Sequence, residues 1–135
     1  MNRAAPLRFA GYAALFDIAD GARDTIRRGA FARTLAERNA PVPLYWQHHP
    51  DQSIGEIEAI AEDARGLRVI ARIDRPDSRA AMLLAKGEVS GLSFGFRTRT
   101  ARQSKAGREL LEIDLFEVSL VTHPLQHGAR VHFVA

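Results

Sequence analysis

Alternating apolar and polar positions run through most of the chain and predict a protein built mainly of β-strands. The first strand is expected over Leu7–Phe16, with a bulge at Gly11. Further strands are predicted over residues 42–47, 53–61, 67–73, 89–100, 110–121 and 129–134, with turns at 62–66 and 104–107. Two prolines near the start of the strand at 42–47 predict that this strand lies at a sheet edge.

Two short helices are predicted between the strands. Residues 29–39 carry an apolar stripe at helical spacing. The second helix would begin after an N-cap at Asp77 or Ser78 and end near Lys86, before Gly87. The sum of six or seven strands and two flanking helices predicts one α+β domain, residues 1–135, built on an antiparallel sheet or a small β-barrel.

The composition narrows the class of protein. Apolar residues make up 46% of the 135 residues, enough for a packed core, and there is no cysteine. The chain therefore has no disulfide scaffold, no thiolate metal site and no cysteine nucleophile. No apolar run approaches the ~18 residues of a membrane span and no signal-peptide core is present, so we expect a soluble protein without a membrane partner. The net charge of +3 is spread among interspersed acids and bases, which argues against nucleic acid as a partner.

Ser93 is the first candidate for chemistry. It lies in Gly91-Leu-Ser-Phe-Gly95, which matches the Gly-x-Ser-x-Gly pattern of the α/β-hydrolase nucleophile elbow. That fold needs a strand–turn–helix around the serine, whereas here the apolar alternation continues through Ser93 to Phe96. Alternation places Ser93 on the face opposite the apolar side chains, between two glycines that leave space around its hydroxyl. The ordinary alternative is a polar side chain on the solvent face of a strand.

His48 and His49 are the second candidates. Adjacent residues of an extended chain point to opposite faces, so at most one of them serves a given site. His48 would share a face with Leu44 and Trp46, which predicts shielding from water. Histidine is the usual base for activating a serine, because its pKa lies near working pH. A surface histidine is the alternative interpretation.

Glu117 is the third candidate. A regular strand would place Ile113, Leu115, Glu117 and Ser119 on one face, so the carboxylate would have apolar neighbours. A partly buried carboxylate needs a partner. One possible partner is a histidine, which the carboxylate would hold in one tautomer, and the alternative partner is an arginine in an ion pair. Asp114 falls on the other face and is expected to be exposed to solvent.

Three histidines, His123, His127 and His132, lie close together late in the chain. They lie in a loop that contains proline and glycine and in the strand that follows it. No cysteine joins them, and no His-Glu-x-x-His motif is present. We therefore expect neither a metal nor another cofactor. His123 follows the long strand directly and is a rival to Glu117 as the third member of a triad.

Five segments, taken in order, resemble the prohead serine proteases of tailed phages, the HK97-like capsid maturation family. The segments are Phe9-Ala-Gly-Tyr-Ala-Ala-Leu-Phe16 with Arg28-Gly-Ala-Phe31; Leu44-Tyr-Trp-Gln-His48 with Ile54-Gly55; Gly66-Leu67; Gly91-Leu-Ser-Phe-Gly-Phe96; and Asp114-Leu-Phe-Glu-Val-Ser-Leu-Val121 with Pro124. The likeness extends from about Phe9 to Val131, and five motifs in the same order are hard to produce by chance.

The resemblance implies a fold and an activity. The family is similar in fold to the herpesvirus assembly proteases (assemblins), which implies a small, mostly antiparallel β-barrel with helices around it. It also implies a serine endopeptidase with Ser93 as nucleophile, His48 as general base and Glu117 as third member. The herpesvirus relatives have a histidine in that third role, so His123 stays open. His49 stands where the family often has an acid, which leaves the choice between His48 and His49 less sharp.

The same resemblance implies partners and a location. The expected substrate is the major capsid protein or its scaffolding domain, cleaved inside the assembling procapsid in the cytoplasm of a bacterial host. The protease itself is a second candidate substrate. The portal, the prohead shell and a second copy of the chain are further candidate partners. The sequence stops at Ala135, where many members continue. This favours a compact member, such as those of reduced phages or phage-derived gene-transfer particles, or a processed product.

Two other classes of function compete with the protease. One is a non-enzymatic capsid-assembly or scaffolding factor of the same fold, and the joint presence of His48, Ser93 and Glu117 argues against it. The other is a small β-barrel that binds nucleic acid, which the scattered charges do not favour.

Overall fold

The computed structural model describes residues 5–135, which form eight strands and two short helices. Their bounds are β1 Leu7–Leu15, β2 Asp24–Ile26, α1 Ala32–Glu37, β3 Pro43–Trp46, β4 His49–Glu62, β5 Gly66–Ile73, α2 Arg79–Ala85, β6 Gly91–Ser104, β7 Gly107–Val121 and β8 Val131–Val134. The predicted α+β class is confirmed. One strand more than predicted is present, because β2 forms within a segment expected to be a loop. The first four residues of the predicted domain 1–135 lie outside the described residues.

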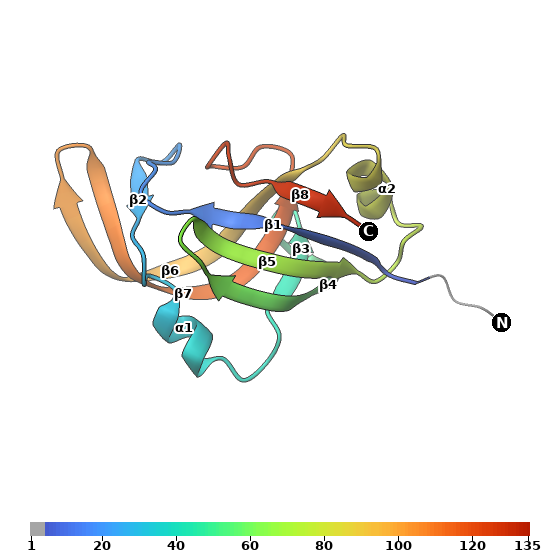
Figure 1. Ribbon diagram of the computed structural model, residues 1–135, viewed down its shortest axis with the longest axis horizontal. Helices are drawn as coiled ribbons and strands as arrows, with labels where there is room; N and C mark the ends of the chain where they lie inside the picture. Colours follow the sequence, from blue (N-terminus) through green and yellow to red (C-terminus); the bar gives the residue numbers. More distant parts are fainter. Residues whose placement is uncertain (1–4) are drawn as a thin grey trace.

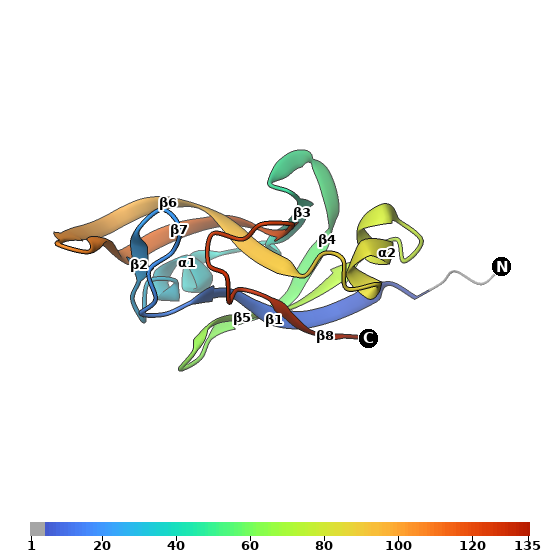
Figure 2. The same ribbon diagram turned by 90° about the horizontal axis from the view of Figure 1, so that it is seen from above.

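All eight strands belong to one curled sheet with the order β2-β7-β3-β4-β5-β1-β8, and β6 pairs with β7 off this path. Figure 1 shows β1, β5 and β4 side by side, with β6 and β7 crossing behind them. Figure 2, turned by 90°, shows that the β6–β7 hairpin extends at one end of the molecule and that α2 lies towards the other end. The core fills the inside of this curl with fully buried side chains that include Phe9, Phe31, Leu44, Leu67, Leu92 and Leu120. Each such side chain stabilises the fold by roughly 1.5–3 kcal/mol.

β3 lies inside the sheet, between β4 and β7. The prediction of an edge strand is therefore wrong. Pro43 is the first residue of β3, a position where a strand tolerates the missing N–H. The interior place of β3 matters because its end leads directly into His48.

β7 connects the parts of the sheet that carry the candidate residues. β6 pairs with it in antiparallel fashion along one edge, while β2 and β3 pair in parallel with the two ends of its other edge. Between β2 and β3 the α1 region covers that edge. The Ile113 N–H donates to the Ala30 carbonyl at 3.1 Å, and the Leu115 N–H donates to Thr34 Oγ1 at 3.0 Å. The backbone of β7 is thus held from both sides just before Glu117.

A bulge in β7 reverses the faces of the strand. The pairing with β6 skips one β7 residue and leaves Phe116 unpaired and 55% exposed. Ile113 and Val118, an odd and an even position, consequently both lie in the core. The prediction that Ile113 and Glu117 share a face is therefore wrong, and Glu117 projects from the face opposite the core.

The two helices lie where the sequence predicts them, although both are shorter. Ser78 is the N-cap of α2, since its Oγ accepts a hydrogen bond from the Ala81 N–H at 3.3 Å. Gly87 follows the helix with a φ of 76°, a conformation that glycine adopts without strain. Within residues 5–135 no helix is long and apolar enough to cross a membrane.

Candidate active site

His48 lies in a two-residue turn and not on a strand. Gln47 and His48 have φ values of 53° and 62°, and Trp46 at the end of β3 pairs with His49 at the start of β4. Positive φ at both central residues is typical of a type I′ hairpin turn. The predicted placement of His48 on the Leu44 and Trp46 face is wrong, because the chain reverses here.

Three groups tie this turn to β7 and to the residues that follow it. The Gln47 N–H donates to the Leu120 carbonyl at 3.0 Å. The Gln47 side chain donates to Thr122 Oγ1 at 2.5 Å and accepts from the Thr122 N–H at 3.2 Å. The His48 N–H donates to Ser119 Oγ at 3.1 Å. The backbone beneath the His48 ring is therefore fixed relative to β7.

The His48 ring faces the Glu117 carboxylate. Nδ1 of His48 lies 2.6 Å from Oε1 of Glu117, with side chains that are 43% and 9% exposed respectively. An ionised carboxylate only accepts hydrogen bonds, so Nδ1 carries the proton and Nε2 is the free basic nitrogen. The hydrogen bond that His48 donates to Glu117 raises the pKa of His48 above its usual value, against the opposing effect of partial burial. Glu117 thus favours the tautomer of His48 in which Nε2 carries no proton.

The second oxygen of the carboxylate is also held. Ser119 is fully buried, and its hydroxyl donates to Oε2 of Glu117 at 2.6 Å. Gly95 lies directly opposite Glu117 on β6 and leaves the space that the carboxylate occupies. A Cβ at Gly95 would lie 3.0 Å from the carboxyl carbon of Glu117 and closer still to Oε1. The absence of a side chain on β6 is therefore part of what positions Glu117.

Ser93 lies on β6 directly opposite Ser119. Paired residues of an antiparallel ladder project to the same face with Cβ atoms about 4.5–5.5 Å apart, so Ser93 lies on the Glu117 side of the sheet. It is 8% exposed, a more enclosed position than the solvent face of a strand would give. No hydrogen bond joins Ser93 to His48 or Glu117 in residues 5–135.

The remaining histidines lie elsewhere. His123 is exposed in the loop after β7 and His49 is exposed at the start of β4. Neither makes a side-chain hydrogen bond to another described residue. His127 is bound by Arg130, and Tyr12 packs edge-on against His132. Among the described residues no group of three or more His, Asp or Glu side chains is placed to hold a metal ion.

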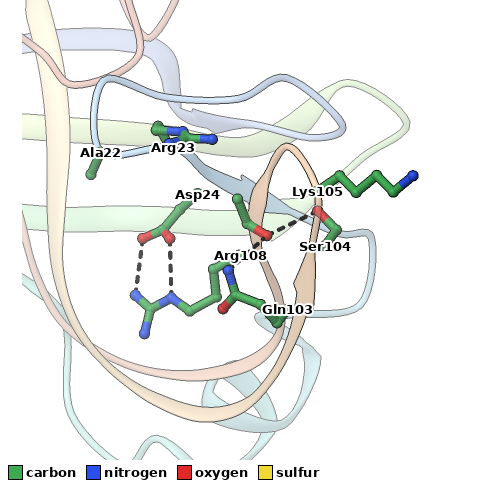
Figure 3. A pocket seen from close by; sticks show the side chains of 8 residues that line it. Ala22, Arg23, Asp24, Gln103, Ser104, Lys105 and Arg108 are labelled. Carbon is green, nitrogen blue, oxygen red and sulfur yellow. Dashed lines mark hydrogen bonds and ion pairs between the residues drawn. The ribbon is translucent and has the colours of Figure 1, made fainter.

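Charged groups farther along the β6–β7 hairpin form ion pairs of their own. Asp114 binds Arg97 at 2.8 Å and Arg99 at 2.9 Å, and its side chain is 18% exposed. The expectation of a freely exposed Asp114 is therefore wrong. Near the tip of the hairpin a hollow of about 430 Å³ surrounds a bidentate pair between Asp24 and Arg108, with both contacts at 3.0 Å (Figure 3). This hollow contains none of the candidate residues.

Three residues of the site are not singled out by sequence patterning. Ser119 has a weak signal, a small polar residue two positions after Glu117 on the same strand. The contribution of Gly95 depends on its pairing with Glu117, which patterning does not reveal. Gln47 is hidden because the turn that contains it looks like a continuing strand.

The fold is shared with proteases of a herpesvirus and of a bacteriophage. The structure of varicella-zoster virus protease superimposes with a TM-score of 0.66 at 21% identity, covering 94% of this chain and 63% of that one. The bacteriophage T4 capsid assembly protease gives a TM-score of 0.66 at 14% identity, covering 86% of this chain and 81% of that one. The predicted likeness to the herpesvirus proteases is confirmed at the level of the fold.

The family model for the caudovirus prohead serine proteases matches residues 2–135, and the chain belongs to this family. The prohead protease of Enterobacteria phage HK97 is 32% identical over 130 residues, which cover 91% of this chain and 58% of that protein. The chain therefore spans somewhat more than half the length of this curated relative. The family predicted from the five ordered segments is confirmed.

Proposed function

We propose that this chain is a serine endopeptidase of capsid maturation. Its substrate is the scaffold portion of the major capsid protein, and also the protease itself, inside the prohead of a tailed phage or a phage-derived gene-transfer particle. The observation that carries the proposal is the 2.6 Å hydrogen bond between His48 and Glu117, formed beside the strand that holds Ser93. Membership of the prohead serine protease family supports the same reaction class.

The proposed mechanism gives each of the three residues a distinct role. Nε2 of His48 takes the proton of the Ser93 hydroxyl while Oγ attacks the peptide carbonyl carbon. Glu117 holds the Nδ1 proton and stabilises the imidazolium that forms. His48 then gives its proton to the leaving amine, and a water molecule activated by His48 hydrolyses the acyl-enzyme. Backbone N–H groups are the expected donors to the oxyanion.

The surface beside His48 is open enough for an extended polypeptide. The small cavity of about 10 Å³ that Ser93 lines contains neither His48 nor Glu117, so it does not enclose the proposed site. His48 is 43% exposed and can be reached from the surface. A chain lying across this face would contact the serine without being engulfed.

Co-expression with the major capsid protein of the same particle tests the proposal. Ser93→Ala and His48→Ala should each abolish the cleavage that the wild-type chain produces. Ser104→Ala, at the far end of the same strand, should cleave normally. Cleavage that persists in Ser93→Ala would overturn the assignment of the nucleophile. Capsid assembly that depends on the chain but shows no cleavage, with no labelling by a serine-reactive phosphonate, would favour the non-enzymatic assembly factor.

A further inference from the structure

A single buried hydroxyl contacts both members of the histidine–carboxylate pair. Ser119 is 0% exposed and lies on β7, two residues after Glu117. Its hydroxyl donates to Oε2 of Glu117 at 2.6 Å and accepts from the His48 N–H at 3.1 Å. A serine hydroxyl offers one donor, so its one proton is committed to the carboxylate.

These two bonds reach the pair from different elements. One bond ends on the side chain of Glu117, and the other ends on the backbone of the turn between β3 and β4 that carries His48. Without the bond from Ser119, the contact with His48 would be the main hydrogen bond that restrains the terminal torsion of the carboxylate, a torsion that is intrinsically broad. Gln47 and His48 both have left-handed backbone, a conformation that persists at residues other than glycine only where the surroundings hold it.

We propose that Ser119 is a positioning residue that fixes the Glu117 carboxylate and the His48 turn relative to each other, so that the His48 ring faces Ser93. The inference rests on the proposed protease function. Ser119 is not itself the nucleophile, because it is fully buried and its proton is held by Glu117. Ser93, directly across the ladder, has no such bond in the described residues and is the hydroxyl left available.

The expected effect of Ser119→Ala is on chemistry more than on folding or substrate binding. The turn would still be tied to β7 through Gln47, whose backbone and side chain make three further bonds. The carboxylate and the ring would lose their fixed orientation, and small misplacements of catalytic groups cost up to about 100-fold in rate. Because Ser119 does not reach the surface, KM should change little.

The experiment uses the full chain and the major capsid protein of the same particle as substrate. Ser119→Ala should lower kcat by about 10- to 100-fold with KM within about twofold. Ser119→Thr keeps the hydroxyl and should recover most of kcat; Ser119→Cys, of similar size but a weak donor, should fall between the two. The matched control is Ser78→Ala, which removes the N-cap of α2 and should lower Tm without changing kcat.

The double variant Glu117→Gln/Ser119→Ala supplies a readout that a merely structural residue would not give. Because Ser119 positions Glu117 and the His48 turn relative to each other, the loss in the double variant should be clearly smaller than the product of the two single losses. A folded Ser119→Ala with wild-type kcat, or two losses that multiply, would overturn the inference. These outcomes differ from a failure of the proposed function, in which Ser93→Ala itself would retain cleavage.

Discussion

Replacing Glu117 by glutamine tests the histidine–carboxylate pair, because it removes the charge and preserves the volume. The contact that changes is the 2.6 Å bond between His48 Nδ1 and Glu117 Oε1. A hydrogen bond to a charged group stabilises by about 1.5–3 kcal/mol. At about 1.36 kcal/mol per factor of ten, this corresponds to roughly 10- to 150-fold in rate. The His48 side chain is 43% exposed, which favours the lower part of that range.

The assay is kcat/KM for cleavage of the capsid protein, measured as a function of pH. A general base is active when neutral, and Glu117 raises the pKa of His48, so the acid limb of the wild-type profile should lie above 6.5. In Glu117→Gln the limb should move down towards 6.5 while the plateau falls. Both changes follow from the same lost bond.

Asp114→Asn is the matched control for this experiment. It removes a carboxylate from the same strand, but one that binds Arg97 and Arg99 and lies away from His48. Its kcat/KM and its acid limb should match those of the wild-type chain. A Glu117→Gln protein with less than about a threefold loss of kcat/KM and an unmoved limb would refute the reasoning.

Three further predictions concern the space that Gly95 leaves for Glu117, the pH dependence of stability, and the ion pair between Asp24 and Arg108. Gly95→Ala should reduce kcat/KM by about 10- to 100-fold in a protein that remains folded, because the new methyl group displaces the Glu117 carboxylate; normal activity would contradict this. The pKa of His48 is raised in the folded state, so the contribution that Glu117 makes to the unfolding free energy through His48 should be complete below about pH 6.5 and lost as pH rises through the folded pKa. Urea titrations of the wild-type chain and Glu117→Gln measure this contribution as the difference between their unfolding free energies. A difference that grows at high pH would exclude the prediction. Asp24→Asn breaks the bidentate pair with Arg108 and should lower the unfolding free energy by about 1–2 kcal/mol with unchanged kcat/KM; an unchanged Tm would show that the pair contributes nothing.

Period-2 alternation identified most of the strands because their side chains do face alternately inward and outward. It failed where the backbone departs from a regular strand. The turn at Gln47 and His48 reads as a continuing strand, since left-handed backbone at residues other than glycine leaves no mark in the hydrophobic pattern. The bulge at Phe116 shifts the alternation by one residue, and for that reason Ile113 lies in the core while Glu117 faces the site.

The candidate site was predictable in its residue types and only partly in its geometry. The roles of His48 as general base and Glu117 as third member stay predictions. Their side chains meet at 2.6 Å because His48 lies in the turn after β3, which pairs with β7. The contributions of Ser119 and Gly95 depend on register between β6 and β7, which only the folded sheet supplies. Long-range pairing is the information that a local pattern lacks.

The identity of the nucleophile is the central claim and can be measured directly. The chain would be treated with a peptidyl phosphonate that reacts with activated serines, and the modified residue would be located by mass spectrometry of its peptides. We expect one adduct, on Ser93, whose formation requires His48 and Glu117. An adduct on another serine, or labelling of Ser93 that is as fast in His48→Ala as in the wild-type chain, would contradict it.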